Sequence, residues 1–197
     1  RFLLRHETRS KSLYDRLHPG MSFAERERCL RDLKAIGFQT GAGFMVGLPS
    51  QELEDYVDDL LFLKDLQPQM VGIGPFIPHE DTPLGSAKPG LLELTCIMLS
   101  LTRLLLPEVL LPATTALGSL NPEGWEKGFN SGANVVMLNL SPPEFRKKYT
   151  LYNGKAAIPD ESRLHLHLVH ERIRKSGFIP EMGKGDHISL TSATPEC

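Results

Sequence analysis

The chain has 197 residues, of which 41% are hydrophobic, 7% aromatic and 23% charged, a composition typical of a globular protein that excludes disordered, collagen-like and fibrous chains. Its 22 Lys and Arg against 24 Asp and Glu give a formal net charge of −2; without a basic run, this balance argues against a nucleic-acid partner. Three isolated cysteines, and no segment that reads as a membrane span or secretory signal, predict a protein of the reducing cytosol, or of an organellar matrix in a eukaryote, with no membrane partner.

Short apolar runs alternate with longer amphipathic stretches, which is the pattern of successive βαβ units with a parallel sheet. No antiparallel hairpin signal interrupts the series, so the predicted fold class is α/β, a (βα)8 barrel of the TIM type. Five strands cannot close such a barrel, and we therefore expect an incomplete one that is part of a longer protein. The predicted strands are Phe2–Leu4, Phe38–Val46, Met70–Phe76, Val109–Thr115 and Asn134–Leu140.

Between these strands the sequence predicts helices. Ser22 and Glu25 have the spacing of a capping box at the start of the first one. After Ser50, apolar residues from Leu53 to Leu66 keep a 3.6-residue period, and the acidic residues, Asp59 among them, are expected on the other faces. The barrel is expected to cover residues 1–177, followed by a mobile tail, residues 178–197. The predicted helices are Phe23–Ile36, Leu53–Leu66, Leu91–Leu106, Glu123–Ser131, Pro142–Tyr149 and Asp160–Ser176.

In barrels of this type the chemistry lies at the carboxyl ends of the strands, so the residues that follow each strand are the candidates. Arg5-His6-Glu7-Thr8 follows the first strand; Glu7 could bind an ammonium group or ribose hydroxyls, or simply pair with Arg5. The glycine-rich stretches 41–49 and 70–79 would let a ligand approach the backbone, but they lack the order of a phosphate-binding loop, and glycines required only by packing are the alternative.

Further polar residues near strand ends are each open to a structural or a ligand-binding interpretation. Thr114 and Thr115 offer hydroxyls, whereas Met137, Tyr149 and Tyr152 lie at or beyond the last strand. His79 with Glu80 and Asp81, and the group His165, His167 and His170, lack the spacing of metal ligands. The sequence therefore predicts no metal site in this chain and leaves the catalytic residue unknown.

Six longer segments, taken together, are diagnostic: LLRHET, GAGFMVGLP, DDLLFLK, MVGIGPFIPHEDTPL, LPATTALG and GANVVMLNLSP. In this order they resemble successive segments of the radical S-adenosylmethionine (SAM) maturases of iron-only hydrogenase, the HydE type, which are related to biotin synthase. The resemblance covers residues 1 to about 177. It implies a (βα)8 barrel, of which about the last five units are present, with SAM and a 4Fe-4S cluster at the strand ends.

The resemblance also implies roles for single residues. Glu7 matches the acidic residue that binds the methionine or ribose part of SAM, and Arg26 matches the arginine that pairs with the SAM carboxylate. Met45 and Ile73 match strand residues near the nucleoside. The positions that match the lining of the substrate cavity are Arg5, Thr114, Thr115, Met137, Tyr149 and Tyr152.

The activity implied by the resemblance is cleavage of SAM to methionine and a 5′-deoxyadenosyl radical. That radical would act on a small, iron-bound, cysteine-containing precursor of the hydrogenase di-iron subcluster, with other maturation proteins as possible partners. The CxxxCxxC cluster ligands are absent here and are expected in a preceding part of the protein, without which the chain would be inactive. A second cluster is not expected, because its positions match Ala157, His165 and Leu168. Two alternatives stay open: a biotin-synthase-like enzyme acting on another sulfur substrate, and a non-catalytic SAM-binding fragment.

Overall fold

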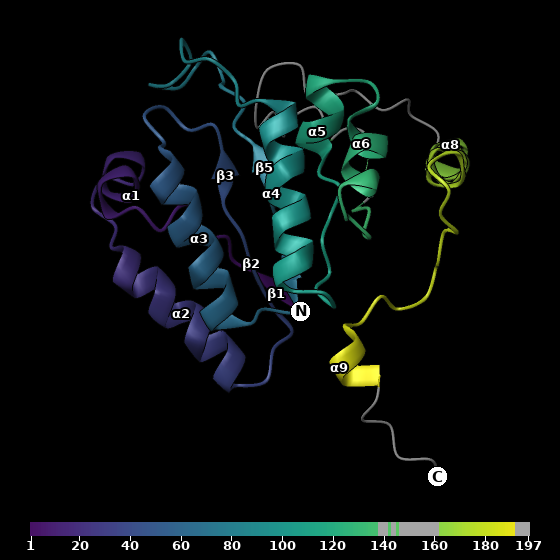
Figure 1. The fold of residues 1–197 in the computed structure, drawn as a ribbon, viewed down its shortest axis with the longest axis horizontal. Coiled ribbons are helices and arrows are strands. Elements are labelled where there is room, and N and C mark those ends of the chain that lie inside the picture. The colour runs from purple at the N-terminus through teal and green to yellow at the C-terminus, as the bar shows by residue number, and fades with distance from the viewer. Residues whose placement is uncertain (138–141, 143–144, 146–161, 192–197) are drawn as a thin grey trace.

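The computed structural model describes residues 1–137, 142, 145 and 162–191, and within them the strands are all parallel. A three-stranded sheet has the order β1 (Phe2–Leu3), β2 (Thr40–Ala42) and β4 (Met70–Val71), and a two-stranded sheet joins β3 (Met45–Val46) to β5 (Gly74–Pro75). Parallel bridges from Met70 to Leu110 and from Pro112 to Val135 continue the first sheet. Neighbours in space are thus neighbours in chain order (Figure 1), which confirms the α/β class with successive parallel strands.

The long strand predicted at Phe38–Val46 is wrong as a single element, because it is interrupted at Gly43 and Phe44. Gly43 has φ +152°, and a Cβ there would lie 2.0 Å from the carbonyl oxygen of Gly72. The backbones of two adjacent strands therefore approach so closely that only glycine fits. The predicted strand Met70–Phe76 divides in the same way into β4 and β5.

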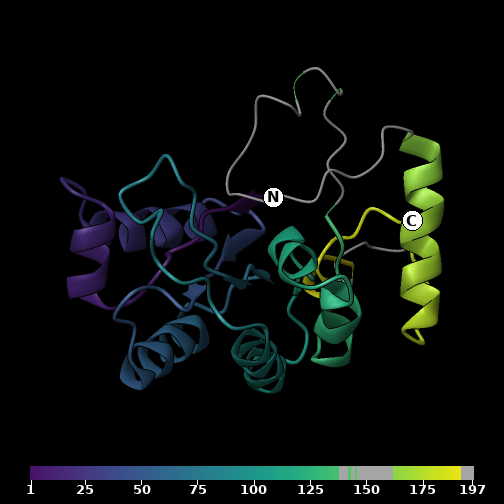
Figure 2. The same cartoon turned by 90° about the horizontal axis from the view of Figure 1, so that it is seen from above.

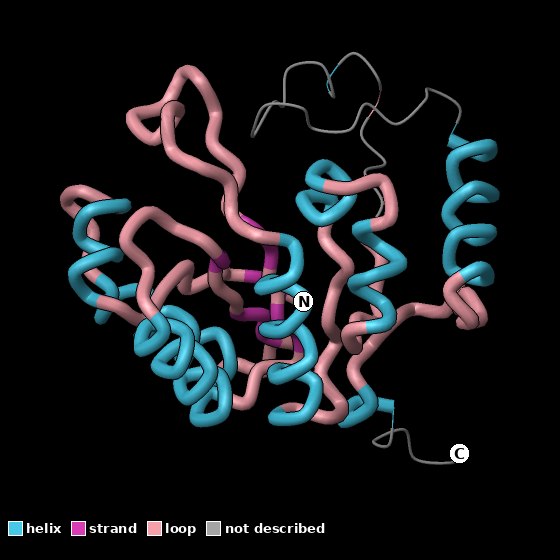
Figure 3. Tube along the Cα trace, turned by 45° about the horizontal axis from the view of Figure 1, so that its top comes forward, coloured by secondary structure: helices cyan, strands magenta, loops and turns pink. Residues whose placement is uncertain are grey.

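Helices lie around the strands (Figure 3). Three of them, α2, α3 and α4, supply the fully buried Leu30, Leu63 and Leu99, which pack in one hydrophobic core with the strand residues Val71 and Ile73. The helices are α1 (Lys11–Leu17), α2 (Phe23–Ala35), α3 (Leu53–Leu66), α4 (Leu92–Leu105), α5 (Thr115–Leu120), α6 (Gly124–Asn130), α8 (Ser162–Lys175) and α9 (Ile188–Thr191). The predictions for α2, α3, α4, α6 and α8 are confirmed within two residues at each end, whereas α1, α5 and α9 were not predicted.

Two local predictions about helices are wrong. Ser22 is the N-cap of α2, but its side chain makes no capping hydrogen bond; the reciprocal capping box instead starts α3, between Glu52 and Asp55. The prediction that the acidic residues of α3 lie away from the core is wrong for Asp59, which is fully buried, whereas Leu53 is 69% exposed. The buried face of α3 is therefore rotated from the one that its leucines alone suggest.

The last described elements pack beside the strand layer. Helix α8 lies against α6 (Figure 2), where both nitrogens Nε and Nη2 of Arg172 donate to the carboxylate of Glu126, at 2.7 and 2.6 Å. The predicted tail is described as far as residue 191, and Gln39 contacts it by hydrogen bonds to Asp186 and His187. Its mobility stays a prediction. The predicted helix Pro142–Tyr149 falls mostly outside the described residues.

Candidate functional site

The turn after β1 places Arg5 and Glu7 at the carboxyl end of the strands. The Glu7 N–H donates to the carbonyl of Gly43 and the Met45 N–H donates to the carbonyl of Glu7, both at 3.0 Å. Glu7 itself has φ +69°, and the N–H of Thr8 donates back to the carbonyl of His6 at 2.9 Å. This is a γ-turn of the rare, strained form, in a residue with a Cβ. The neighbouring strand residues therefore hold Glu7 in a conformation that it would not adopt by itself.

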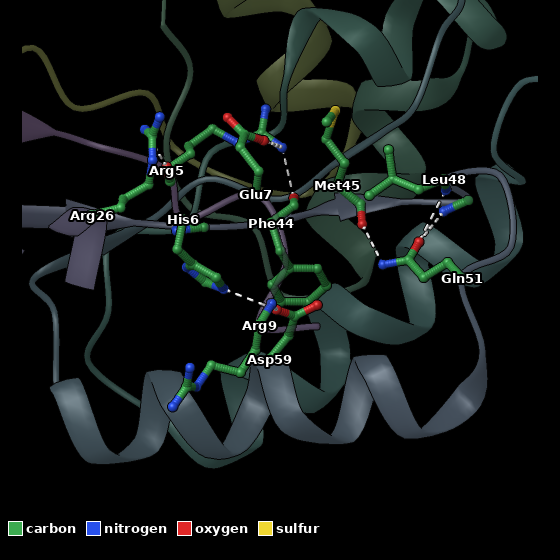
Figure 4. Close-up of polar contacts among 12 residues, drawn as sticks. Arg5, His6, Glu7, Arg9, Arg26, Phe44, Met45, Leu48, Gln51 and Asp59 are labelled. Atoms are coloured by element: carbon green, nitrogen blue, oxygen red, sulfur yellow. Dashed lines mark hydrogen bonds and ion pairs between the residues drawn. The ribbon is translucent and has the colours of Figure 1, made fainter. Parts of the chain in front are cut away.

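The Glu7 carboxylate faces the Arg5 guanidinium (Figure 4), with Nη2 and Oε2 3.3 Å apart. The same Nη2 donates a shorter bond, 2.7 Å, to the carbonyl of Phe44. Pairing with Arg5, the structural alternative for Glu7, is therefore present. Yet Glu7 Oε2 and Arg5 Nε are buried and have no hydrogen-bond partner among the described residues. The Arg5 and Glu7 side chains are 29% and 20% exposed, so a ligand can reach the pair, and buried polar atoms are seldom left without a partner.

Arg26 reaches the same turn from α2. Its Nε donates to the hydroxyl of Tyr14 at 2.7 Å, and its Nη1 donates to the carbonyl of Arg5 at 3.1 Å. Two bonds from different nitrogens fix the plane of the guanidinium. The structure therefore brings Arg5, Glu7 and Arg26, three of the predicted site residues, to one end of the first strand.

Met45 and Thr114 lie further along the same strand ends. Met45 pairs with Gly74 in the β3–β5 register, and a Cβ at Gly74 would meet the Thr114 hydroxyl oxygen at 3.0 Å. That hydroxyl is also buried without a hydrogen-bond partner among the described residues. Thr114 ends its segment as the N-cap of α5 and Thr115 is the first residue of that helix, so the strand predicted to reach Thr115 ends earlier.

The other predicted site residues are less closely grouped. Ile73 is fully buried in the hydrophobic core, so its side chain has no surface that a ligand could contact in this structure. Met137 is 47% exposed, and Tyr149 and Tyr152 lie outside the described residues. The roles assigned to all of these residues stay predictions.

The loop after β3 is held by side chains from α3 and its approach. Gln51 Oε1 accepts from the N–H groups of Gly47 and Leu48, at 2.9 and 3.0 Å, while its Nε2 donates to the carbonyl of Met45 (Figure 4). The Tyr56 hydroxyl is a second acceptor for the Gly47 N–H. The backbone around Met45 is therefore fixed on the side that faces α3.

Sequence reasoning missed a buried polar pair beneath this site. His6 and Asp59 are both fully buried, with His6 Nε2 3.1 Å from Asp59 Oδ1. Burial lowers the pKa of His6 to about 3 and raises the pKa of Asp59 to about 8, although the Arg9 N–H that donates to Asp59 lowers the latter. Burial therefore favours the uncharged form of each group. Asp59 is three residues from both Tyr56 and Phe62, so helical spacing places it on the same, buried face of α3. This spacing was the sequence signal for its burial.

No metal centre is found among the described residues of this site. Among the described residues, no group of three or more His, Cys, Asp or Glu side chains is placed to hold a metal ion. A cavity of about 270 Å³ lies at the opposite, amino-terminal ends of the strands, between Gln69, Val109 and His187, away from the candidate site. No described helix is long and apolar enough to cross a membrane.

Comparison with known proteins supports the resemblance seen in the sequence. The chain is 49% identical to the [FeFe] hydrogenase maturase subunit HydE of Thermotoga maritima over 180 residues, which cover 91% of this chain and 52% of that protein. It is 34% identical to the 3-methylornithine synthase of Methanosarcina acetivorans, over 68% of this chain and 38% of that one. It is 29% identical to the biotin synthase of Gloeothece citriformis, over 77% and 45%. No family model matches. The chain spans about half the length of the curated relatives it matches.

Proposed function

Because this chain is a relative of the HydE-type [FeFe] hydrogenase maturase, we propose that it forms part of the SAM site and substrate cavity of a radical SAM enzyme of hydrogenase maturation. The parallel strands in chain order would be about five units of its (βα)8 barrel. The substrate would be a small, iron-bound, cysteine-containing precursor of the di-iron subcluster. Other maturation proteins are the partners that this role implies.

One observation carries the proposal for this site. At the strand ends, Glu7 Oε2 lies 3.3 Å from Arg5 Nη2 in an ion pair, yet neither it nor Arg5 Nε has a hydrogen-bond partner among the described residues. A carboxylate oxygen in that position accepts hydrogen bonds from ribose hydroxyls or from an ammonium group, and SAM carries both. Arg26, fixed on Tyr14 and on the Arg5 carbonyl, provides the planar cation that suits the SAM carboxylate.

The remaining residues would shape the site around the ligand. Met45 borders the strand ends, and Ile73 would contact the nucleoside through its backbone because its side chain is in the core. The Thr114 hydroxyl, which has no hydrogen-bond partner in the described part of the chain, would provide a hydrogen-bonding group for substrate. Arg5 and Thr115 complete the described part of the predicted cavity.

The cluster does not fit the described part of this chain. In radical SAM enzymes a reduced 4Fe-4S cluster supplies the electron that cleaves SAM, but the described residues hold no suitable group of ligands. We therefore expect its ligands elsewhere in the protein, and no second cluster, since Ala157 and Leu168 cannot bind iron.

The test is SAM binding by the protein as its gene encodes it, measured by isothermal titration calorimetry. Glu7→Gln keeps the size of the side chain but removes its charge, and Arg26→Lys removes the planar fork. We expect each to raise the Kd for SAM at least about tenfold, since each removes a hydrogen bond to a charged group. Glu25→Gln, on the exposed face of α2, should leave the Kd unchanged. Wild-type affinity in Glu7→Gln would refute the proposed site.

A second function is supported by the similarity to biotin synthase over 77% of this chain. An enzyme of that kind would act on a different sulfur-containing substrate. The reduced, iron- and sulfide-reconstituted protein should form 5′-deoxyadenosine in either case. The two functions differ in the product: a modified iron-bound precursor that activates hydrogenase, or a thiolated small molecule. SAM binding without any cleavage would instead indicate a non-catalytic SAM-binding protein.

A further inference from the structure

The buried His6–Asp59 pair lies directly beneath the candidate site and joins three segments of the fold. Asp59 is on α3, and its Oδ1 is 3.1 Å from His6 Nε2 and accepts the Arg9 N–H at 2.6 Å. On the other side of the ring, the N–H of Gly43 donates to His6 Nδ1 at 3.3 Å. One imidazole thus connects the turn after β1, the junction of β2 and β3, and the middle of α3.

These bonds fix the tautomer of the imidazole. Because the Gly43 N–H donates to Nδ1, that nitrogen carries no proton, and the neutral ring must carry its proton on Nε2. Nε2–H therefore donates to Asp59 Oδ1. The ring is also held by packing, with its centroid 4.8 Å from that of Phe62 and 6.0 Å from that of Phe44. Its orientation is determined on all sides.

The pair flanks the strained turn on both sides. The turn is centred on Glu7 at φ +69°; His6 precedes it and Arg9, bound through its N–H to Asp59, follows it. Figure 4 shows His6 pointing toward α3 and Asp59, whereas Glu7 lies on the other side of the strand beside Arg5. A residue with φ in this region persists only where its surroundings fix it. The buried pair provides that fixation from within the core.

We propose that His6 and Asp59 are positioning residues: together they hold the Glu7 turn and thereby set the affinity of the site for SAM. The inference rests on the proposed function, in which Glu7 binds SAM, and neither His6 nor Asp59 touches the ligand. A polar pair with only a packing role would be replaceable by apolar side chains of similar size without effect on Glu7.

The test uses the protein as its gene encodes it, with His6→Leu, which removes both bonds of the imidazole and keeps an apolar side chain. Two quantities are measured: the Kd for SAM by calorimetry, and hydrogen exchange of the Glu7 and Met45 amides, whose bonds close the turn. We expect His6→Leu to raise the Kd at least about tenfold and to speed exchange of these two amides, while the amide of Leu99 in α4 keeps its protection.

Conservative variants separate positioning from general stability. His6→Gln retains a donor near Nε2 for Asp59 and should recover part of the affinity, whereas His6→Asn retains only an acceptor for Gly43. His6→Asn, which loses the bond to Asp59, is the milder variant if His6→Leu does not fold. Asp58→Asn makes the same Asp-to-Asn replacement at the exposed neighbouring position and should change neither quantity.

The outcomes separate this inference from the proposed function. Unchanged exchange at Glu7 and Met45, or a Kd within twofold of wild type while Glu7→Gln weakens binding, would overturn it. Faster exchange spread equally to Leu99 would also overturn it, because the pair would then be only a stability element. If Glu7→Gln binds SAM as wild type does, the proposed site fails. In that case, faster exchange confined to the turn in His6→Leu would still support the conclusion that His6 and Asp59 hold the Glu7 turn, and unchanged exchange would refute it.

Discussion

The pair of neutral groups in the core makes a testable prediction for the pH dependence of stability. Burial raises the pKa of Asp59 from 3.8 to about 8, so the folded state keeps a proton that the unfolded state releases. This costs stability as the pH rises from about 4 to about 8. Burial lowers the pKa of His6 from 6.5 to about 3. The unfolded state then binds a proton that the folded state does not, which costs stability as the pH falls from 6.5 to about 3.

The two contributions have opposite slopes and cancel between about pH 4 and pH 6.5, so only Asp59 acts between pH 6.5 and pH 8. One proton corresponds to about 1.4 kcal/mol per pH unit, and over this window wild type should lose about 2 kcal/mol through Asp59. Asp59→Asn removes the ionisable group and should lose none by this route. The difference between the two proteins cancels the titrating groups that do not interact with residue 59.

The assay is urea unfolding followed by circular dichroism at half-unit steps from pH 6.5 to pH 8, with the free energy of unfolding obtained by linear extrapolation. Glu25→Gln, which removes an exposed carboxylate on α2, should keep the wild-type slope. Equal slopes for wild type and Asp59→Asn would show that Asp59 is ionised throughout the window. The carboxylate would then accept from a neutral imidazole, and the argument for two neutral partners would be wrong.

Three further perturbations test the packing. Gly43→Ala places a Cβ 2.0 Å from the carbonyl oxygen of Gly72 at φ +152°, so it should cost at least about 3 kcal/mol in urea unfolding; a loss below about 1 kcal/mol would contradict the close strand approach. Leu99→Ala removes a fully buried side chain and should cost about 2–5 kcal/mol, and a cost typical of surface sites would contradict its place in the core. Arg172→Ala removes the paired bonds to Glu126 and should speed limited proteolysis within α8, with little change in the unfolding of the sheet; equal cleavage rates would show that other contacts hold the helix.

The order of helices and strands could be predicted because it depends on hydrophobic periodicity, which is visible in the sequence alone. Helices α2, α3 and α4 are long and amphipathic, and turn signals such as Gly37 mark an end. Strand interiors were less accessible. The interruption at Gly43 arises from the carbonyl of Gly72, a neighbour only in space, and no local pattern encodes that distance.

The part of the candidate site that directly follows a predicted strand could be predicted from the sequence. Arg5 and Glu7 follow a recognisable strand, and the structure places them together. Asp59 was assigned to the solvent because acidic residues on a helix usually face water, and its burial depends on a histidine 53 positions away. The missing information was tertiary: a polar residue on a buried face requires a partner, and that partner lay in the very tetrapeptide that the strand end had already singled out.

This arrangement explains why a neutral pair suits the position beneath the site. An ion pair buried at the same place would carry a large desolvation cost, and the loss of either partner would leave an unpaired charge in the core. A neutral imidazole and a carboxylic acid keep the directionality of hydrogen bonds without that charge. His6 and Glu7 lie on opposite sides of the chain (Figure 4), so His6 can be fixed from α3 while Glu7 faces the strand ends. The charges of the turn then lie on Glu7 and Arg5, where a polar ligand can contact them. The buried pair contributes the hydrogen bonds that fix the conformation of the turn.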